Sequence, residues 1–166
     1  MAQNSISADA GPRMRALVRS AAFGDVVTIL MRAPKHKSMS LDALRVFVLP
    51  AIAHNQYLIA RVRREKSGSL AAGVALWASV SDEIDKRLRA TPQQPLRLSF
   101  DEWKSGPNLW LVDLVAPAAL AGSIFRDLDQ KIAKTRPMAT QIVSPGGKAV
   151  VTTVKALVAG LKKEPA

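Results

Sequence analysis

The sequence predicts a single-domain α/β (α+β) fold in which a mixed sheet is flanked by helices. Helical and strand-like segments alternate along the chain, which is the pattern of such folds. The 166 residues, of which 48% are apolar and 22% charged, are enough for one hydrophobic core. An almost wholly apolar segment, residues 108–117, has the length of a buried strand. We expect residues 1–12 to form a flexible N-terminal segment and residues 13–166 to form the domain.

Two helices are predicted in the first third of the chain. Apolar residues recur at helical spacing over residues 23–31, and Pro34 ends that helix. Ser40 is a suitable N-cap for the second helix, and Pro50 disturbs its last turn. The expected buried stripe of this second helix consists of Leu41, Leu44, Val48 and Ile52.

The rest of the chain alternates between strands and helices. Ser81 opens a third helix, and a turn at residues 145–147 separates the last two strands. The expected strands are residues 57–64, 70–79, 96–100, 108–117, 138–143 and 149–154, with a hairpin loop at 65–69 and a loop at 91–95. A fourth helix is expected over residues 120–134.

Asp113 is the exception in the apolar segment at 108–117. In a regular strand it shares a face with Leu111 and Val115. Burying an ionised carboxylate is costly unless donors or a cation satisfy it, so this residue needs a partner. Two readings follow from the pattern: a structural acid that binds backbone amides, or one half of a catalytic pair.

The charge of the chain narrows the classes of partner. Twenty-four Lys and Arg against thirteen Asp and Glu give a net charge of +11, which attracts acidic proteins, nucleic acid or anionic membranes. The absence of cysteine excludes disulfides and fits a cytoplasmic location, and two histidines are too few for a His-rich metal site. We expect no signal peptide and no transmembrane segment, because no apolar run is long enough.

Two separated motifs resemble those of the toxin-activating lysine acyltransferases that modify RTX protoxins. The first motif spans residues 24–36 and ends in Ala-Pro-Lys-His, and the second spans residues 101–117 and contains Asp-Glu-Trp-Lys-Ser-Gly and Leu-Trp-Leu-Val-Asp. Between them, residues 76–83 are similar to the Trp-containing strand and following helix of the family. The resemblance covers about residues 23–135.

This resemblance implies a fold and an activity. The fold is expected to be similar to that of the GCN5-related N-acetyltransferases, so that residues 13–166 are an acyltransferase-like domain. The expected activity transfers a fatty acyl group from acyl carrier protein to the side-chain amine of an internal protoxin lysine, with catalytic residues His36 and Asp113. The expected partners are acyl carrier protein and an RTX-type protoxin; a homodimer stays open, and no specific nucleic acid is expected.

The chemistry gives these two residues complementary roles. A lysine amine has a pKa of about 10.4, so only on the order of one in a thousand is neutral at pH 7. His36 is expected to act as general base, with Asp113 orienting its ring, or else to be acylated itself before the lysine attacks. The thioester supplies the leaving group, so neither a metal nor a further cofactor is expected; the cofactor-binding residues are unknown.

Two alternatives stay open. Ala118, Ala119 and Leu120 stand where the family usually has a Phe-Gly-Gly-like turn, which leaves room for an acyltransferase with a non-toxin substrate. A non-catalytic basic binding module is the other alternative. Six basic residues are expected to bracket the site: Arg13, Arg15, Arg19, Arg32, Lys35 and Lys37.

Overall fold

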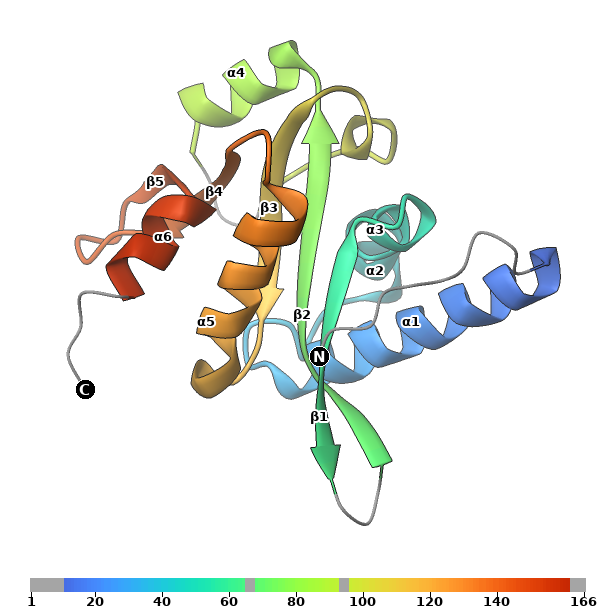
Figure 1. Ribbon diagram of the computed structural model, residues 1–166. Helices are drawn as coiled ribbons and strands as arrows, with labels where there is room; N and C mark the ends of the chain where they lie inside the picture. Colours follow the sequence, from blue (N-terminus) through green and yellow to red (C-terminus); the bar gives the residue numbers. More distant parts are fainter. Residues whose placement is uncertain (1–10, 65–67, 93–95, 162–166) are drawn as a thin grey trace.

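The computed structural model describes residues 11–64, 68–92 and 96–161, and it contains a five-stranded mixed sheet flanked by helices (Figure 1). The strands lie in the sheet in their order along the chain. They are β1 (Tyr57–Arg64), β2 (Gly68–Val80), β3 (Asn108–Val115), β4 (Met138–Val143) and β5 (Ala149–Thr153). This confirms the predicted fold class, whereas the similarity to the acetyltransferase fold stays a prediction.

The sheet is mixed because one of its four ladders is parallel. Neighbouring strands pair antiparallel in the β1–β2, β2–β3 and β4–β5 ladders. The β3–β4 ladder is parallel, because the chain crosses over between them through α5 (Ala118–Asp127) and the π-helical turn η2 (Leu128–Ile132). This parallel ladder pairs only Leu109 to Leu111 with Met138 to Thr140.

Helices cover both faces of the sheet. On one face, α1 (Pro12–Arg32), α2 (Leu41–Phe47) and α3 (Leu49–Ala53) share a core cluster with Val74, Leu76, Ala78 and Val80 of β2. α4 (Asp82–Ala90) and the 3-10 turn η1 (Asp101–Trp103) contribute to the same cluster. On the other face, α5, η2 and α6 (Val154–Leu161) pack on Ala75 and Trp77, and Figure 1 shows α5 lying across β3.

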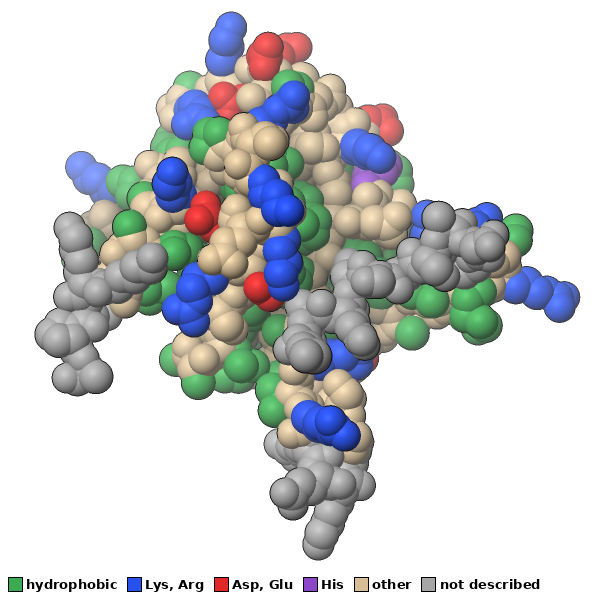
Figure 2. Space-filling model, in the orientation of Figure 1, with side chains coloured by type: hydrophobic (Ala, Val, Ile, Leu, Met, Phe, Trp, Pro, Cys, Tyr) green, Lys and Arg blue, Asp and Glu red, His purple; other side chains and the backbone are tan. Residues whose placement is uncertain are grey.

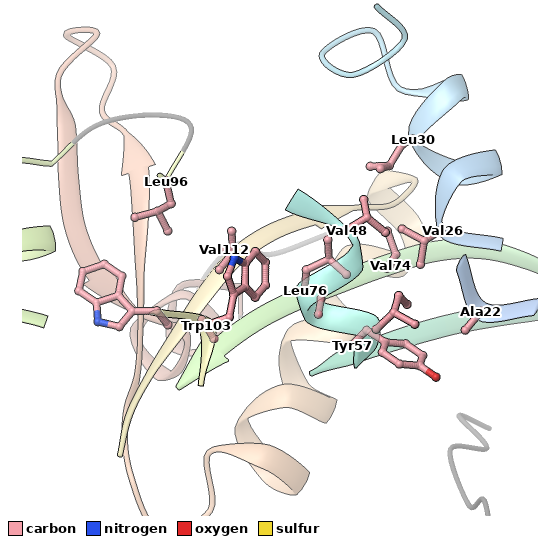
Figure 3. Close-up of a cluster of buried hydrophobic side chains, with 14 of the residues drawn as sticks. Ala22, Val26, Leu30, Val48, Tyr57, Val74, Leu76, Leu96, Trp103 and Val112 are labelled. Carbon is pink, nitrogen blue, oxygen red and sulfur yellow. The ribbon is translucent and has the colours of Figure 1, made fainter. Parts of the chain in front are cut away.

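The larger core cluster joins α1 to the centre of the sheet. Figure 3 shows Val26 and Leu30 of α1 beside Val48 and Val74, all at most 2% exposed. Burial of each such side chain stabilises the fold by about 1.5–3 kcal/mol. The cluster fixes α1, and with it the segment that follows Arg32, against β2.

Most predicted elements are confirmed, with differences at specific places. The first helix begins at Pro12, well before the apolar repeat at residues 23–31, and the division into residues 1–12 and 13–166 stays a prediction. Leu41 is 85% exposed instead of buried, because it is the first residue of α2 and points away from the stripe. Residues 96–100 are not a strand; Leu96 still packs in the core.

Some expectations fall on residues that lie outside the described part. These are most of the segment 1–12, most of the hairpin loop at 65–69, part of the loop at 91–95, and the end of the chain from residue 162. Among residues 11–64, 68–92 and 96–161, no helix has both the length and the apolar character needed to cross a membrane.

Candidate active site

His36 is placed by the turn that follows α1. Pro34 disfavours a helical conformation for Ala33, which is extended (φ −86°, ψ 121°) and ends the helix. The backbone N–H of His36 donates to the carbonyl of Ala33 (2.9 Å), and the N–H of Met39 donates to the carbonyl of His36 (2.9 Å). These bonds hold the turn and direct the imidazole toward the sheet.

Asp113 is placed by a β-bulge in β3. Trp77 pairs with Leu111 and Leu76 pairs with Asp113, so Val112 is an extra residue in β3. Leu76 faces the α1 side of the sheet, whereas Trp77 and Leu111 face the α5 side. Asp113 therefore faces α1. The expectation that it shares a face with Leu111 is wrong, because the bulge reverses the alternation between these two residues.

The structure brings His36 and Asp113 together, although they lie 77 positions apart in the sequence. Nε2 of His36 lies 2.5 Å from Oδ2 of Asp113. The two atoms are in close contact, but the direction of the ring N–H does not give a well-aligned hydrogen bond. The other carboxylate oxygen, Oδ1, accepts a hydrogen bond from the backbone N–H of Leu114 (3.0 Å).

The pair is more buried than expected. The side chain of His36 is 4% exposed and that of Asp113 is 10% exposed. The ring of Phe47 packs on the imidazole with 5.8 Å between centroids, and Phe47 in turn contacts Trp103. His36 is therefore enclosed by its neighbours, and Asp113 is the member of the pair that lines a cleft.

Lys35 is the second basic side chain at the Asp113 carboxylate. Its Nζ donates to Oδ1 at 3.3 Å, and its side chain is 55% exposed. Burial alone raises the pKa of Asp113, but the bond with His36 and the charge of Lys35 outweigh it. The pKa of Asp113 consequently lies below its ordinary value, and the carboxylate is ionised near neutral pH.

A cleft opens where the parallel strands separate. Beyond the three-residue ladder, β3 continues to Val115 and β4 continues to Val143, and a cavity of about 300 Å³ lies between them. Its polar residues are Lys35, Asp113, Thr140 and Gln141. Its apolar lining consists of Leu111, Val112, Leu114, Phe125, Ile142, Val143 and Leu157. An apolar cleft with a few polar groups at one side is the usual form of a small-molecule site.

The Asp-Glu-Trp-Lys-Ser-Gly segment supports the sheet rather than the pair. Glu102 accepts a bidentate ion pair from Arg87 (2.7 and 3.0 Å), and the N–H of Ser105 donates to the carbonyl of Ser79 (2.8 Å). A Cβ on Gly106 would lie 2.5 Å from the Cα of Ser81, so this position requires glycine. The segment therefore fixes the loop that leads into β3.

The basic residues do not form one cluster around His36. α1 rises about 1.5 Å per residue, so Arg13 lies roughly 29 Å along the helix from Arg32. Of the six, only Lys35 and Lys37 belong to the turn that holds His36, and Arg32 is the last residue of α1 before it. Figure 2 shows Lys and Arg side chains spread over several elements of one face, with Asp and Glu among them.

Sequence reasoning missed three contributors to the site. Phe47 covers the imidazole, and Val143 lines the cleft. Leu157 also lines the cleft, from α6, which lies beyond the region of the resemblance. Their apolar side chains would suit any hydrophobic core, so the sequence pattern does not distinguish them as residues of a site. Within the described part of the chain, no three His, Asp or Glu side chains gather as metal ligands would.

Comparison with known proteins gives several toxin-activating lysine acyltransferases among the relatives of this chain. The chain is 27% identical to the RTX-III toxin-activating lysine-acyltransferase ApxIIC of Actinobacillus pleuropneumoniae over 66% of its own length and 58% of the relative. It is 30% identical to the leukotoxin-activating lysine-acyltransferase LtxC of Aggregatibacter actinomycetemcomitans over 57% of its own length and 52% of the relative. It thus spans little more than half the length of these two relatives.

Two further matches extend this result. The chain is 27% identical to the uncharacterized protein sll0720 of Synechocystis over 66% of its own length and 71% of that protein. The model of the RTX toxin acyltransferase family matches residues 15–156, which include His36, Asp113 and the whole sheet. The chain therefore belongs to the RTX toxin acyltransferase family.

Proposed function

We propose that this protein is a protein-lysine acyltransferase of the cytoplasm. It transfers a fatty acyl group from the thioester of acyl carrier protein to the side-chain amine of an internal lysine in an RTX-type protoxin. The observation that carries this proposal is the contact between His36 and Asp113 beside the apolar cleft, in a chain of this family.

The cleft between β3 and β4 is the proposed site for the acyl donor. Its apolar side chains suit an alkyl chain, and its volume of about 300 Å³ admits a slender ligand. The carrier's prosthetic arm contains amides, which can hydrogen-bond to strand backbone where the parallel ladder stops. The thioester carbonyl then comes to rest near Asp113 and Lys35.

The proposed base is the His36–Asp113 pair. The acceptor lysine arrives as an ammonium, since its pKa is about 10.4, and must lose a proton to attack. Asp113 faces the cleft and attracts the ammonium, and the Asp113–His36 pair takes up the proton. General base catalysis of this kind contributes about 10²–10⁴-fold.

Burial of His36 favours direct attack over an acylated histidine. Its Nε2 is buried and lies 2.5 Å from Oδ2 of Asp113, so an acyl carbon on Nε2 would have to displace the carboxylate. In the direct route, the amine nitrogen bonds to the thioester carbon, the carbon–sulfur bond breaks, and the carrier thiol leaves. The thioester supplies the leaving group, so no metal or redox cofactor takes part in the proposed reaction.

A non-toxin acceptor is the second candidate. Pro117 is followed at once by α5, which begins at Ala118, where the family usually has a glycine-containing turn. This different loop lies next to β3 and the cleft, so it supports a different acyl chain or acceptor while leaving the chemistry unchanged.

The test is a transfer assay with acyl-loaded carrier protein and an RTX-type protoxin. Carrier protein bearing octanoyl, lauroyl or palmitoyl groups is incubated with the full chain, and free thiol and intact mass of the acceptor are followed. We expect acyl addition to lysine that disappears with His36→Ala and Asp113→Asn. Thiol release without protoxin acylation would favour the non-toxin acceptor, and no thiol release with any chain would refute the proposal.

A further inference from the structure

Lys35 has the contacts that an acceptor lysine would need. Its Nζ lies 3.3 Å from Oδ1 of Asp113, while His36 contacts Oδ2 of the same carboxylate. It is the only lysine among the described residues that line the β3–β4 cleft. With 55% of its side chain exposed, it is also free to move within the cleft, unlike the buried His36.

We propose that Lys35 is a self-acylation site, modified by the donor when no acceptor protein is bound. This inference rests on the proposed function, because it uses the same acyl thioester and the same base. Lys35 carries a primary amine at the place where the pair attracts the acceptor ammonium. Self-modification therefore requires no group beyond those already at the site.

The step balances as an ordinary aminolysis. The Lys35 ammonium gives one proton to the His36–Asp113 pair, and the neutral nitrogen attacks the thioester carbon. The carbon–nitrogen bond forms, the carbon–sulfur bond breaks with its electron pair on sulfur, and the thiolate takes up a proton. The nitrogen loses its second proton as the amide forms, so ammonium and thioester give amide, thiol and one released proton.

Lys37 provides an internal comparison two residues away. It is exposed like Lys35, but it does not line the cleft and makes no ion pair with Asp113. Uncatalysed acylation would reach both lysines, since both are accessible. Catalysed acylation would select Lys35.

The modification would also block the enzyme. The amide carries no charge, so Asp113 loses the ion pair to Lys35, and the attached acyl chain is held at the mouth of the cleft that the donor uses. Acylated Lys35 would thus define an inhibited form that accumulates when donor is abundant and acceptor is scarce.

The experiment uses the full chain with palmitoyl- or octanoyl-loaded carrier protein and no acceptor. Intact mass and peptide mapping follow the modification over time, in the wild type and in Lys35→Arg, Asp113→Asn and Lys86→Arg. Lys86 is an exposed lysine of α4 outside the cleft lining, which makes its variant the matched control. Circular dichroism checks that each variant is folded.

We expect a single acyl group on Lys35 in the wild type and in Lys86→Arg, formed at a rate per chain that does not depend on protein concentration. It should be absent in Lys35→Arg and at least about tenfold slower in Asp113→Asn, with Lys37 near background throughout. Equal acylation of Lys35 and Lys37, or an unchanged rate in Asp113→Asn, would overturn the inference. Lys35 that stays unmodified in the acceptor-free reaction, in a preparation that transfers to an added acceptor, would overturn it and leave the proposed function standing; no thiol release at all would remove both.

Discussion

Asp113 lies opposite Leu76 in the β2–β3 ladder, one residue out of the register that Trp77 and Leu111 set. The shift puts the carboxylate on the face of the sheet that carries α1, where His36 follows the helix. In a regular strand, the same sequence would turn Asp113 toward α5. The bulge at Val112 is therefore the local feature that makes the His36–Asp113 contact.

Deletion of Val112 tests the role of the bulge. Removing the extra residue leaves both pairs intact, Trp77 with Leu111 and Leu76 with Asp113, so Asp113 keeps its face. We expect the variant to lose stability, because Val112 is 5% exposed, yet to retain acyl transfer closer to wild type than Asp113→Asn. Transfer rates and thermal unfolding measure the two effects.

Deletion of Leu114 is the matched control. It follows Asp113 and pairs with Ala75 in the regular part of the ladder, so its loss shifts Val115 to the wrong face. This variant should unfold or lose transfer altogether. If the two deletions behaved alike, the bulge would not be what orients Asp113.

The sequence was sufficient to predict elements whose signals are local. Ser40 and Ser81 cap their helices as expected, accepting hydrogen bonds from the N–H groups of Ala43 (3.1 Å) and Ile84 (3.3 Å). Pro34 ends α1 because a proline disfavours the helical conformation of the residue before it, here Ala33. His36 and Asp113 are predicted as a pair from the resemblance, because two motifs occur in order; their separation in the sequence reveals nothing of the distance between them in space.

The remaining features depend on long-range pairing. The bulge exists only because β2 and β3 meet in a particular register, which Val112 does not encode by itself. Burial of His36 depends on Phe47, a residue of α2 that the sequence gives no reason to pair with it. The cleft depends on where the β3–β4 ladder stops, so Leu157 could not be assigned to it beforehand.

Combining the two active-site substitutions tests whether they act as a unit. Asp113 contacts His36 at Nε2, so removing either residue disables the same proton transfer. We expect His36→Ala and Asp113→Asn each to slow transfer by at least about 10²-fold. The double variant should be little slower than the slower single variant. Multiplicative losses in single-turnover rates would show that the residues act independently.

Leu157→Trp tests the assignment of the acyl chain to the β3–β4 cleft. Leu157 lines the cleft from α6, so the larger indole should shorten the space available to the chain. We expect palmitoyl transfer to fall by about tenfold or more relative to octanoyl transfer. Ala156→Trp is the control, because Ala156 is exposed on the same helix and does not line the cleft. Equal slowing of both chains would place the acyl group elsewhere.

His54 should make folding stability depend on pH near neutrality. Partial burial, followed by the charges of Lys104 and Arg19, lowers the pKa of His54 below its ordinary value of about 6.5. The unfolded chain therefore binds the proton first as pH falls. The contribution of His54 to the free energy of unfolding is fully present above the pKa that His54 has in the unfolded chain. It is lost as pH drops from about 7 toward 5.

His54→Gln isolates this effect. Its free energy of unfolding, measured by urea titration across that range, should fall less steeply with decreasing pH than that of the wild type. All other ionisable groups are present in both proteins, so the comparison isolates His54. Identical slopes would show that folding does not lower the pKa of His54.

Salt should act on carrier docking and not on the chemical step. Acyl carrier protein is acidic and this chain carries a net charge of +11, so their encounter is favoured by charges that salt screens within about 8 Å at physiological strength. We expect roughly 0.5 M salt to weaken donor binding severalfold while the rate at saturating donor changes little. Lys37→Glu should reproduce this effect, because Lys37 is exposed in the turn that holds His36. Lys35 is unsuitable for this test because it pairs with Asp113.

Lys86→Glu is the control of equal net charge. Its helix, α4, lies at the start of β3, where Asn108 donates to Asp82 (2.7 Å), five residues before Asp113. Reversing the charge of Lys86 should leave donor binding close to wild type if the carrier protein docks at the turn that holds His36. Nucleic acid should bind loosely and without sequence preference, as it would to any basic surface. If donor binding ignored salt and both reversals while a defined nucleic acid bound tightly at about 0.2 M salt, a binding module would explain the charge better than an acyltransferase.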